Sequence, residues 1–99
     1  MYLRKDLEHD LKQTREKIGS ELRRYREEVG FNSPYDVSRE IAGGNDTIYK
    51  IEKGVNLPSR RTIAELARLY RLNPMEEKEL GKLINHAKSL KKKLKELHS

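Results

Sequence analysis

The chain has 99 residues, of which 34% are hydrophobic and 38% are charged, so it has room for one small domain with a modest core. It contains no cysteine, which excludes disulfide bonds and thiolate metal sites. Because there is neither a run of about 18 apolar residues nor the apolar segment of a signal peptide, we expect a cytoplasmic protein that does not span a membrane.

The net charge of +6 is concentrated near the C-terminus. Residues 1–17 and 18–85 each carry one excess positive charge, whereas residues 86–99 carry four. Total charge is therefore a poor indicator of an anionic partner, because the central part of the chain is almost neutral.

Residues 2–17 are predicted to form an N-terminal helical extension. Leu3, Leu7 and Leu11 recur at intervals of four residues, which places them on one helix face. The extension either continues into the next helix or breaks near residues 14–19. Three hypotheses account for the leucine stripe: it packs on the domain, it makes a dimer, or the helix frays.

The next helix is predicted at residues 18–29, with Gly30 ending it. Its buried stripe consists of Ile18, Leu22, Tyr25 and Val29. Ser33-Pro34 then predicts the start of a second helix that runs to about Ile41, because serine caps a first turn and proline fits the first helical position.

A short helix is predicted at Asn45–Gly54, after a tight turn at Gly43-Gly44. Ile48 and Ile51 are three residues apart, so they share one face and can point at a core. A helix, a glycine turn and a second helix make up a helix-turn-helix arrangement.

The other face of this short helix carries hydrogen-bonding side chains. They are Asn45, Asp46, Tyr49, Lys50 and Lys53. Asn45 or Asp46 is expected to cap the first turn, and Gly54 is expected to end the helix in a left-handed turn.

Two further helices follow in the sequence. Ser59 is expected to cap a fourth helix at Arg60–Arg71, and Asn73-Pro74 starts a fifth. Apolar residues along the fifth helix alternate spacings of three and four, which forms a heptad seam: Leu80, Leu83, Ala87, Leu90, Leu94 and Leu97. This seam packs in a dimer or, within one chain, against the first helix of the domain. Alternatively, the helix is frayed and solvated, or it is a basic tail that contacts DNA or RNA.

The whole pattern resembles the lambda/434-repressor family of helix-turn-helix domains. The matching residues are Ile18-Gly19, Leu22-Arg23, Arg26, Gly30, Ile48, Ile51-Glu52, Gly54, Pro58 and the run Thr62-Ile63-Ala64-Glu65-Leu66-Ala67. The resemblance implies an all-α, five-helix DNA-binding domain at residues 18–85. An extra helix at residues 1–17 precedes this domain, and its long C-terminal helix ends in a basic tail at residues 86–99.

The resemblance also implies which side chains contact DNA. The base-contacting positions fall on Asn45, Asp46 and Lys50, whose side chains suit adenine, cytosine and guanine respectively. Tyr49 is expected to touch a thymine methyl group or a phosphate. The predicted phosphate contacts are Lys53, Arg60, Arg61, Arg39 and the backbone of Gly44. For each of these cations the alternative is an ordinary solvated position.

Arg26 and Glu52 correspond to an internal ion pair of the family, which would tie the first helix to the recognition helix. Pro34 stands where the family often has a phosphate-binding glutamine, so that contact is not expected here. Gly43 replaces a residue that is commonly apolar or β-branched, which predicts a looser turn.

Nothing in the sequence indicates catalysis, a cofactor or a metal ion. His9, His86 and His98 lack metal-ligand spacing, and the glycine pair is not followed by the Lys-Ser/Thr of a phosphate loop. We therefore expect a transcriptional regulator and not an enzyme.

The expected function is sequence-specific binding of double-stranded DNA by a repressor that acts as a homodimer on a palindromic operator. The dimer is predicted to use the terminal helices, because so small a domain has little surface on which to bury both leucine stripes. The alternatives are an antitoxin-type or other protein-interaction module that also binds DNA, and a basic-tailed RNA-binding adaptor.

Overall fold

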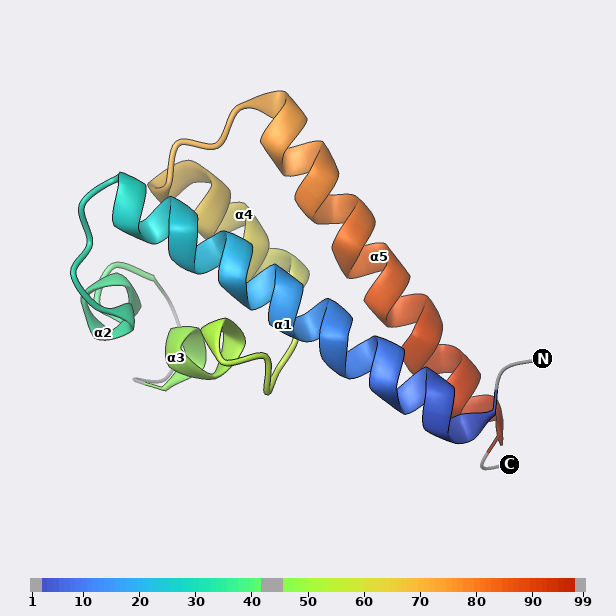
Figure 1. Ribbon diagram of the computed structural model, residues 1–99. Coiled ribbons are helices and arrows are strands. Elements are labelled where there is room, and N and C mark those ends of the chain that lie inside the picture. The colour runs from blue at the N-terminus through green and yellow to red at the C-terminus, as the bar shows by residue number, and fades with distance from the viewer. Residues whose placement is uncertain (1–2, 42–45, 98–99) are drawn as a thin grey trace.

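The computed structural model describes residues 3–41 and 46–97, and this part of the chain contains helices and no strand. The helices are α1 (Arg4–Glu28), α2 (Pro34–Ser38), α3 (Thr47–Glu52), α4 (Arg60–Leu69) and α5 (Pro74–Leu97). The expected all-α fold is confirmed. α1 and α5 lie side by side and antiparallel, and the three shorter helices gather around the C-terminal half of α1 (Figure 1). None of the described helices combines the length and the apolar composition needed to span a membrane.

Several helix ends follow the local sequence signals. The first turns of α2, α4 and α5 are capped by Ser33, Ser59 and Asn73, whose side-chain oxygens each accept a hydrogen bond from the backbone amide three residues on. Gly30 and Gly54 follow α1 and α3 with φ angles of 97° and 77°. Glycine adopts this left-handed conformation without strain, so both helices end where predicted.

α2 and α4 are shorter than the sequence predicts. α2 ends at Ser38 and not near Ile41, and the Ser38 hydroxyl donates to the carbonyl of Pro34 at 3.1 Å. α4 ends at Leu69, and Arg71 has a φ of 55°, so the chain has already left the helix there.

The predicted N-terminal extension and the first domain helix form one continuous helix, so the expected division between them falls inside α1. Thr14 is accommodated because its hydroxyl donates to the carbonyl of Asp10 at 2.8 Å. Gly19 marks a close approach and not a break: a Cβ there would collide with the backbone carbonyls of the last turn of α3. Val29, predicted to be buried, is 39% exposed because it lies just beyond the end of α1.

The leucine stripes of the two terminal segments belong to α1 and α5, and they pack against each other within one chain. The buried members are Leu7, Leu11, Leu80, Ala87 and Leu90. The intramolecular alternative is therefore the one found, and the argument that these stripes require a second copy fails. Only Leu3 and Leu97, at the tip where α1 begins and α5 ends, stay largely exposed.

Candidate functional site

α3 turns one face to the core and the other to solvent. Ile48 and Ile51 are 1% and 3% exposed, as their spacing predicts. Asp46, Tyr49 and Lys50 are exposed on the outer side. α3 contacts both α1 and α2, so two neighbours determine the direction in which this outer face points.

A buried ion pair fixes α3 to α1. The Arg26 guanidinium donates through Nε to Glu52 Oε2 at 2.7 Å and through Nη2 to Oε1 at 3.2 Å, while Nη1 donates to the carbonyl of Phe31 at 2.7 Å. The two side chains are only 5% and 6% exposed. Burial lowers the pKa of Arg26, but the hydrogen bond and negative charge of Glu52 outweigh this, so the pKa is raised and the guanidinium stays charged.

Tyr70, at the end of α4, lies close to this ion pair. Its ring is 6.4 Å from that of Phe31, and its hydroxyl is buried without a hydrogen-bond partner among the residues that the structure describes. Burial raises the pKa of this hydroxyl, and the charge of Glu52 raises it further. The ion pair therefore lies in a poorly solvated environment, in which losing one partner is costly.

The structure describes Asp46 and Lys50, two of the positions predicted to contact DNA, and two others lie outside its described ranges. Asp46 is at the N-cap of α3, but its side chain makes no capping hydrogen bond, so the expected capping role is not found for it. Lys50 is exposed and makes no ion pair with any residue in the described ranges. Asn45 and Gly44 lie outside the described residues.

Tyr49 is half of an exposed aromatic pair. Its ring stacks on that of Tyr35, with the ring centroids 6.3 Å apart and the planes 12° from parallel. The ammonium of Lys53 lies 5.6 Å from the centre of the Tyr49 ring, in range of a cation–π interaction. Sequence reasoning missed Tyr35, because only the packing of α2 against α3 brings the two tyrosines together.

The four predicted phosphate-binding side chains occupy different environments. Lys53 lies over Tyr49. Arg39 pairs with Asp36 at 3.3 Å and Arg61 with Glu65 at 3.1 Å, and both arginine side chains are largely exposed. Their carboxylate partners are more covered, at 34% exposed for Asp36 and 17% for Glu65. Arg60 is exposed at the start of α4.

A hollow in the surface lies between α3 and the loop that follows it. It is lined by Asp46, Thr47 and Lys50 at α3, by Ser59 and Thr62 at the start of α4, and by Lys91 of α5. Sequence reasoning did not assign Lys91 to this site. No local signal could have done so, because Lys91 is far from α3 in sequence and arrives there only through the packing of α5 on α1.

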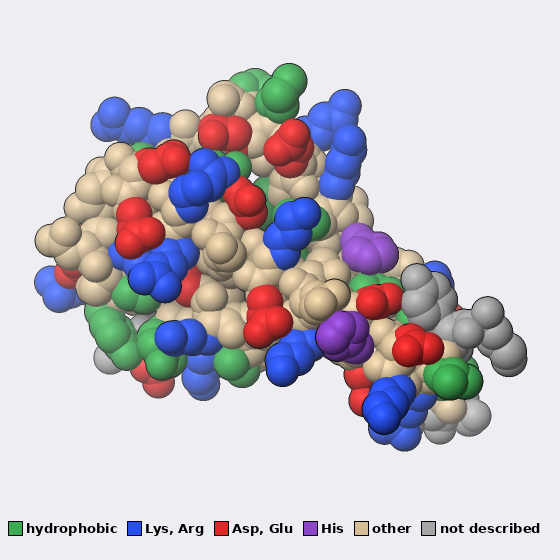
Figure 2. Space-filling view, viewed as in Figure 1, with side chains coloured by type: hydrophobic (Ala, Val, Ile, Leu, Met, Phe, Trp, Pro, Cys, Tyr) green, Lys and Arg blue, Asp and Glu red, His purple; other side chains and the backbone are tan. Residues whose placement is uncertain are grey.

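The face of the molecule shown in Figure 2 carries acidic and basic side chains interspersed, and neither sign dominates it. α1 alone has several exposed ion pairs, including Arg24–Glu28 at 3.0 Å. A phosphate backbone attracts surfaces on which positive charge gathers. The mixed charge of this face therefore does not by itself mark a nucleic-acid interface.

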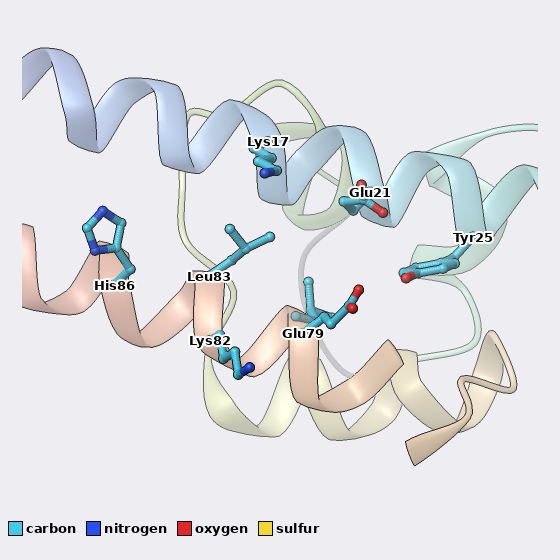
Figure 3. A pocket seen from close by; sticks show the side chains of 8 residues that line it. Lys17, Glu21, Tyr25, Glu79, Lys82, Leu83 and His86 are labelled. Carbon is cyan, nitrogen blue, oxygen red and sulfur yellow. The ribbon is translucent and has the colours of Figure 1, made fainter. Parts of the chain in front are cut away.

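A groove also runs between α1 and α5 (Figure 3). Lys17, Glu21 and Tyr25 line it from α1, and Glu79, Lys82, Leu83 and His86 face them from α5. Burial and the nearby charge of Glu76 raise the pKa of Tyr25. Among the described residues, no group of three His, Cys, Asp or Glu side chains is placed to hold a metal ion.

Comparison with known proteins gave one match. A family model described as a helix-turn-helix domain matches residues 17–80, roughly two thirds of the chain. No curated protein and no solved structure matches the chain. The matched span runs from the middle of α1, through α2, α3 and α4, into the first turns of α5, so it includes every described residue of the hollow except Lys91.

Proposed function

The chain belongs to the helix-turn-helix domain family, and from this premise we propose that it is a transcriptional regulator that binds a specific sequence of double-stranded DNA. α3 is the recognition helix and enters the major groove. One observation carries the proposal: the buried isoleucines and the Arg26–Glu52 pair hold α3 from behind, while its polar side chains face solvent. A rigidly held polar helix face is what base recognition requires.

The outer side chains of α3 have the chemistry for base contacts. Lys50 donates to guanine O6 and N7, and Asp46, whose carboxylate makes no capping bond, accepts from cytosine N4. The stacked pair of Tyr49 and Tyr35 offers an apolar edge to a thymine methyl group or to the sugar of a nucleotide. Asn45 suits adenine, the base with which asparagine pairs through two hydrogen bonds.

Phosphate contacts position the domain without selecting a sequence. Lys53, Arg60 and Arg61 provide them beside α3, and Arg39 provides one at the end of α2. For Arg39 and Arg61, binding exchanges a carboxylate partner within one helical turn for a phosphate.

We further propose that two copies act as a repressor on a palindromic operator, each contacting one half-site. The support is the resemblance of residues 18–80 to the lambda/434-repressor family. Because the leucine stripes are buried within one chain, little apolar surface remains at the tip beyond Leu3 and Leu97. We therefore expect the free protein to associate weakly and to pair on DNA, which sedimentation with and without operator measures.

A protein-interaction module, such as an antitoxin, would be favoured by an apolar extension left exposed for a partner. The helix that was expected to provide it is covered by α5, because Leu7 and Leu11 are buried. No described feature of the extension now favours that function over DNA binding alone.

Selection of bound sequences from random duplex DNA tests the proposed function. We expect an enriched palindrome whose half-sites lie about 10 base pairs apart, one turn of the duplex. Binding that is equally strong on all sequences, with nothing enriched, would contradict sequence-specific regulation.

Lys50→Ala tests the assignment of α3 as the recognition helix. We expect the preference at one base position to relax by about 1–3 kcal/mol, the usual value of a good bidentate base contact. Competition binding with single-base variants of the selected sequence measures this. Lys53→Ala is the matched control and should weaken all variants equally. If Lys50→Ala does the same, Lys50 contacts only phosphate.

A further inference from the structure

Four lysines form a ridge along the outer part of α5. This lysine ridge consists of Lys88, Lys91, Lys92 and Lys95, all of them exposed. Their spacings of three and four residues place them on one face of the helix. They line a shallow depression to which no other described residue contributes, so its charge is of a single sign.

Two hollows connect the ridge to the surface around α3. Lys91 lines the hollow described above, together with Asp46 and Lys50. Lys88 lines a second hollow with Arg60 and Pro58, at the start of α4. The ridge therefore continues the surface that carries the proposed base and phosphate contacts.

The other flank of the α1–α5 pair has a different character. The groove there is lined by residues of both charges, Lys17 and Lys82 as well as Glu21 and Glu79 (Figure 3). Because this flank carries both signs of charge, it attracts a polyanion less than a surface of a single sign does. Along the lysine ridge, positive charge thus gathers on the flank that adjoins α3.

We propose that the lysine ridge binds the phosphate backbone of the DNA that adjoins the half-site contacted by α3. The inference rests on the proposed function and gives α5 a part in it. At about 1.5 Å per residue the ridge is about 10 Å long, and a duplex carries one charge per about 1.7 Å. About six phosphate charges therefore lie within its length.

Duplex DNA fits the ridge better than a lipid surface does. Lysine ammonium groups on flexible stems bind phosphates as point charges without selecting a sequence. A helix that binds a membrane surface inserts its apolar face into the lipid. In α5 most of that face is buried against α1, so it is not available for insertion into lipid.

The test is the salt dependence of DNA binding. The variant Lys88→Gln/Lys91→Gln/Lys92→Gln removes three charges from the ridge. The matched control Lys17→Gln/Lys82→Gln/Lys93→Gln removes three from the other flank, where helical periodicity also places Lys93. Glutamine is close to lysine in helix propensity, so circular dichroism should show both variants folded. Binding is measured between about 50 and 200 mM salt, on a duplex carrying the selected sequence and on a mixed-sequence duplex of equal length.

For the ridge variant, we expect the slope of log affinity against log salt concentration to decrease in magnitude by about two to three. Each phosphate contact contributes about 0.9 to this slope. The control variant should keep nearly the wild-type slope, and both should keep the wild-type base preference. Ethylation of phosphates beside the half-site should hinder the wild-type protein and no longer affect the ridge variant.

An unchanged slope for the ridge variant, or equal losses in the two variants, would overturn the proposal. Failure to select any sequence would instead overturn the proposed function, and the slopes on the mixed-sequence duplex would still decide the role of the ridge. If the triple variant unfolds, Lys91→Gln against Lys93→Gln makes the same comparison with an expected difference of about 0.9 in slope.

Discussion

The body of the molecule and its outer hairpin are held together in different ways (Figure 1). In the body, where α2, α3 and α4 surround the C-terminal half of α1, α3 is fixed by buried isoleucines and by the Arg26–Glu52 pair. In the outer hairpin, which we define as residues 4–14 of α1 and 88–97 of α5, two helices meet along one apolar seam that contains Leu11 and Leu90.

This difference suits the two kinds of DNA contact proposed, base contacts by the body and phosphate contacts by the outer hairpin. Base contacts need side chains held to a fraction of an ångström, which the closely packed body can provide. Phosphate contacts tolerate movement, so a two-helix hairpin is sufficient for them. The body coincides with most of the span matched by the family, whereas the outer hairpin lies outside it. Sequence specificity would then come from the part of the chain that the family model matches, and the added affinity from the part outside it.

The largest expected effect is on the buried ion pair of the body. Arg26→Met or Glu52→Gln should each lower the free energy of unfolding by about 3–5 kcal/mol, because the remaining charge is left buried without a partner. Thermal and urea unfolding measure this loss. Arg23→Met is the control, since its exposed pair with Glu27 spans 3.8 Å and should matter little. Wild-type melting of both ion-pair variants would show that the pair does not fix α3.

Leu90→Ala should open the outer hairpin and leave the body folded. Truncating a buried leucine costs about 2–5 kcal/mol, and Leu90 contributes to the seam between α5 and α1. Hydrogen exchange should then quicken first at residues 4–14 and 88–97. Leu66→Ala, in the core of the body, should quicken exchange throughout. The same uniform pattern for both variants would mean that body and hairpin unfold as one unit.

A pair of glycines distinguishes the crowded body from the open side of α5. Gly19→Ala should destabilise by about 1–3 kcal/mol despite its better helix propensity, because the added methyl group meets the backbone of α3. The methyl group added by Gly81→Ala meets no neighbouring atom, so this substitution should raise the free energy of unfolding by about 0.5–1 kcal/mol. Urea unfolding of both variants decides between these signs. A stabilising Gly19→Ala would mean that α3 does not approach α1 closely in solution.

A further small effect is expected at Tyr70. Because burial raises the pKa of its hydroxyl, the folded protein retains a proton that the unfolded chain loses above its pKa of about 10. The contribution of this difference to the free energy of unfolding is complete below that pH and is lost as the pH rises above it.

Tyr70→Phe should therefore lose less stability than the wild type between about pH 9 and pH 11. At neutral pH it should be about 1 kcal/mol more stable, since it removes a buried hydroxyl without a described partner. Urea unfolding at each pH measures this, with Tyr35→Phe as the control at an exposed tyrosine. A Tyr70→Phe protein that follows the wild-type profile would show that folding does not raise the pKa of Tyr70.

Local patterns in the sequence determined most of the elements. The caps at Ser33, Ser59 and Asn73 and the isoleucine spacing in α3 predicted helix starts and a buried face that the structure contains. The ion pair of Arg26 with Glu52 followed from family resemblance, because a separation of 26 residues gives no local signal. These features are recoverable because capping and periodicity depend on neighbouring residues alone.

Tertiary structure alone decided how distant segments meet. A leucine stripe shows that a helix face must be covered, but whether the cover is another segment or another copy depends on the direction of each helix. α5 returns along α1, so the two stripes cover each other and Lys91 comes to line the same hollow as Lys50. Gly19 looked like a break and is the point where α3 crosses α1. Packing between elements sets these distances, and no local pattern encodes it.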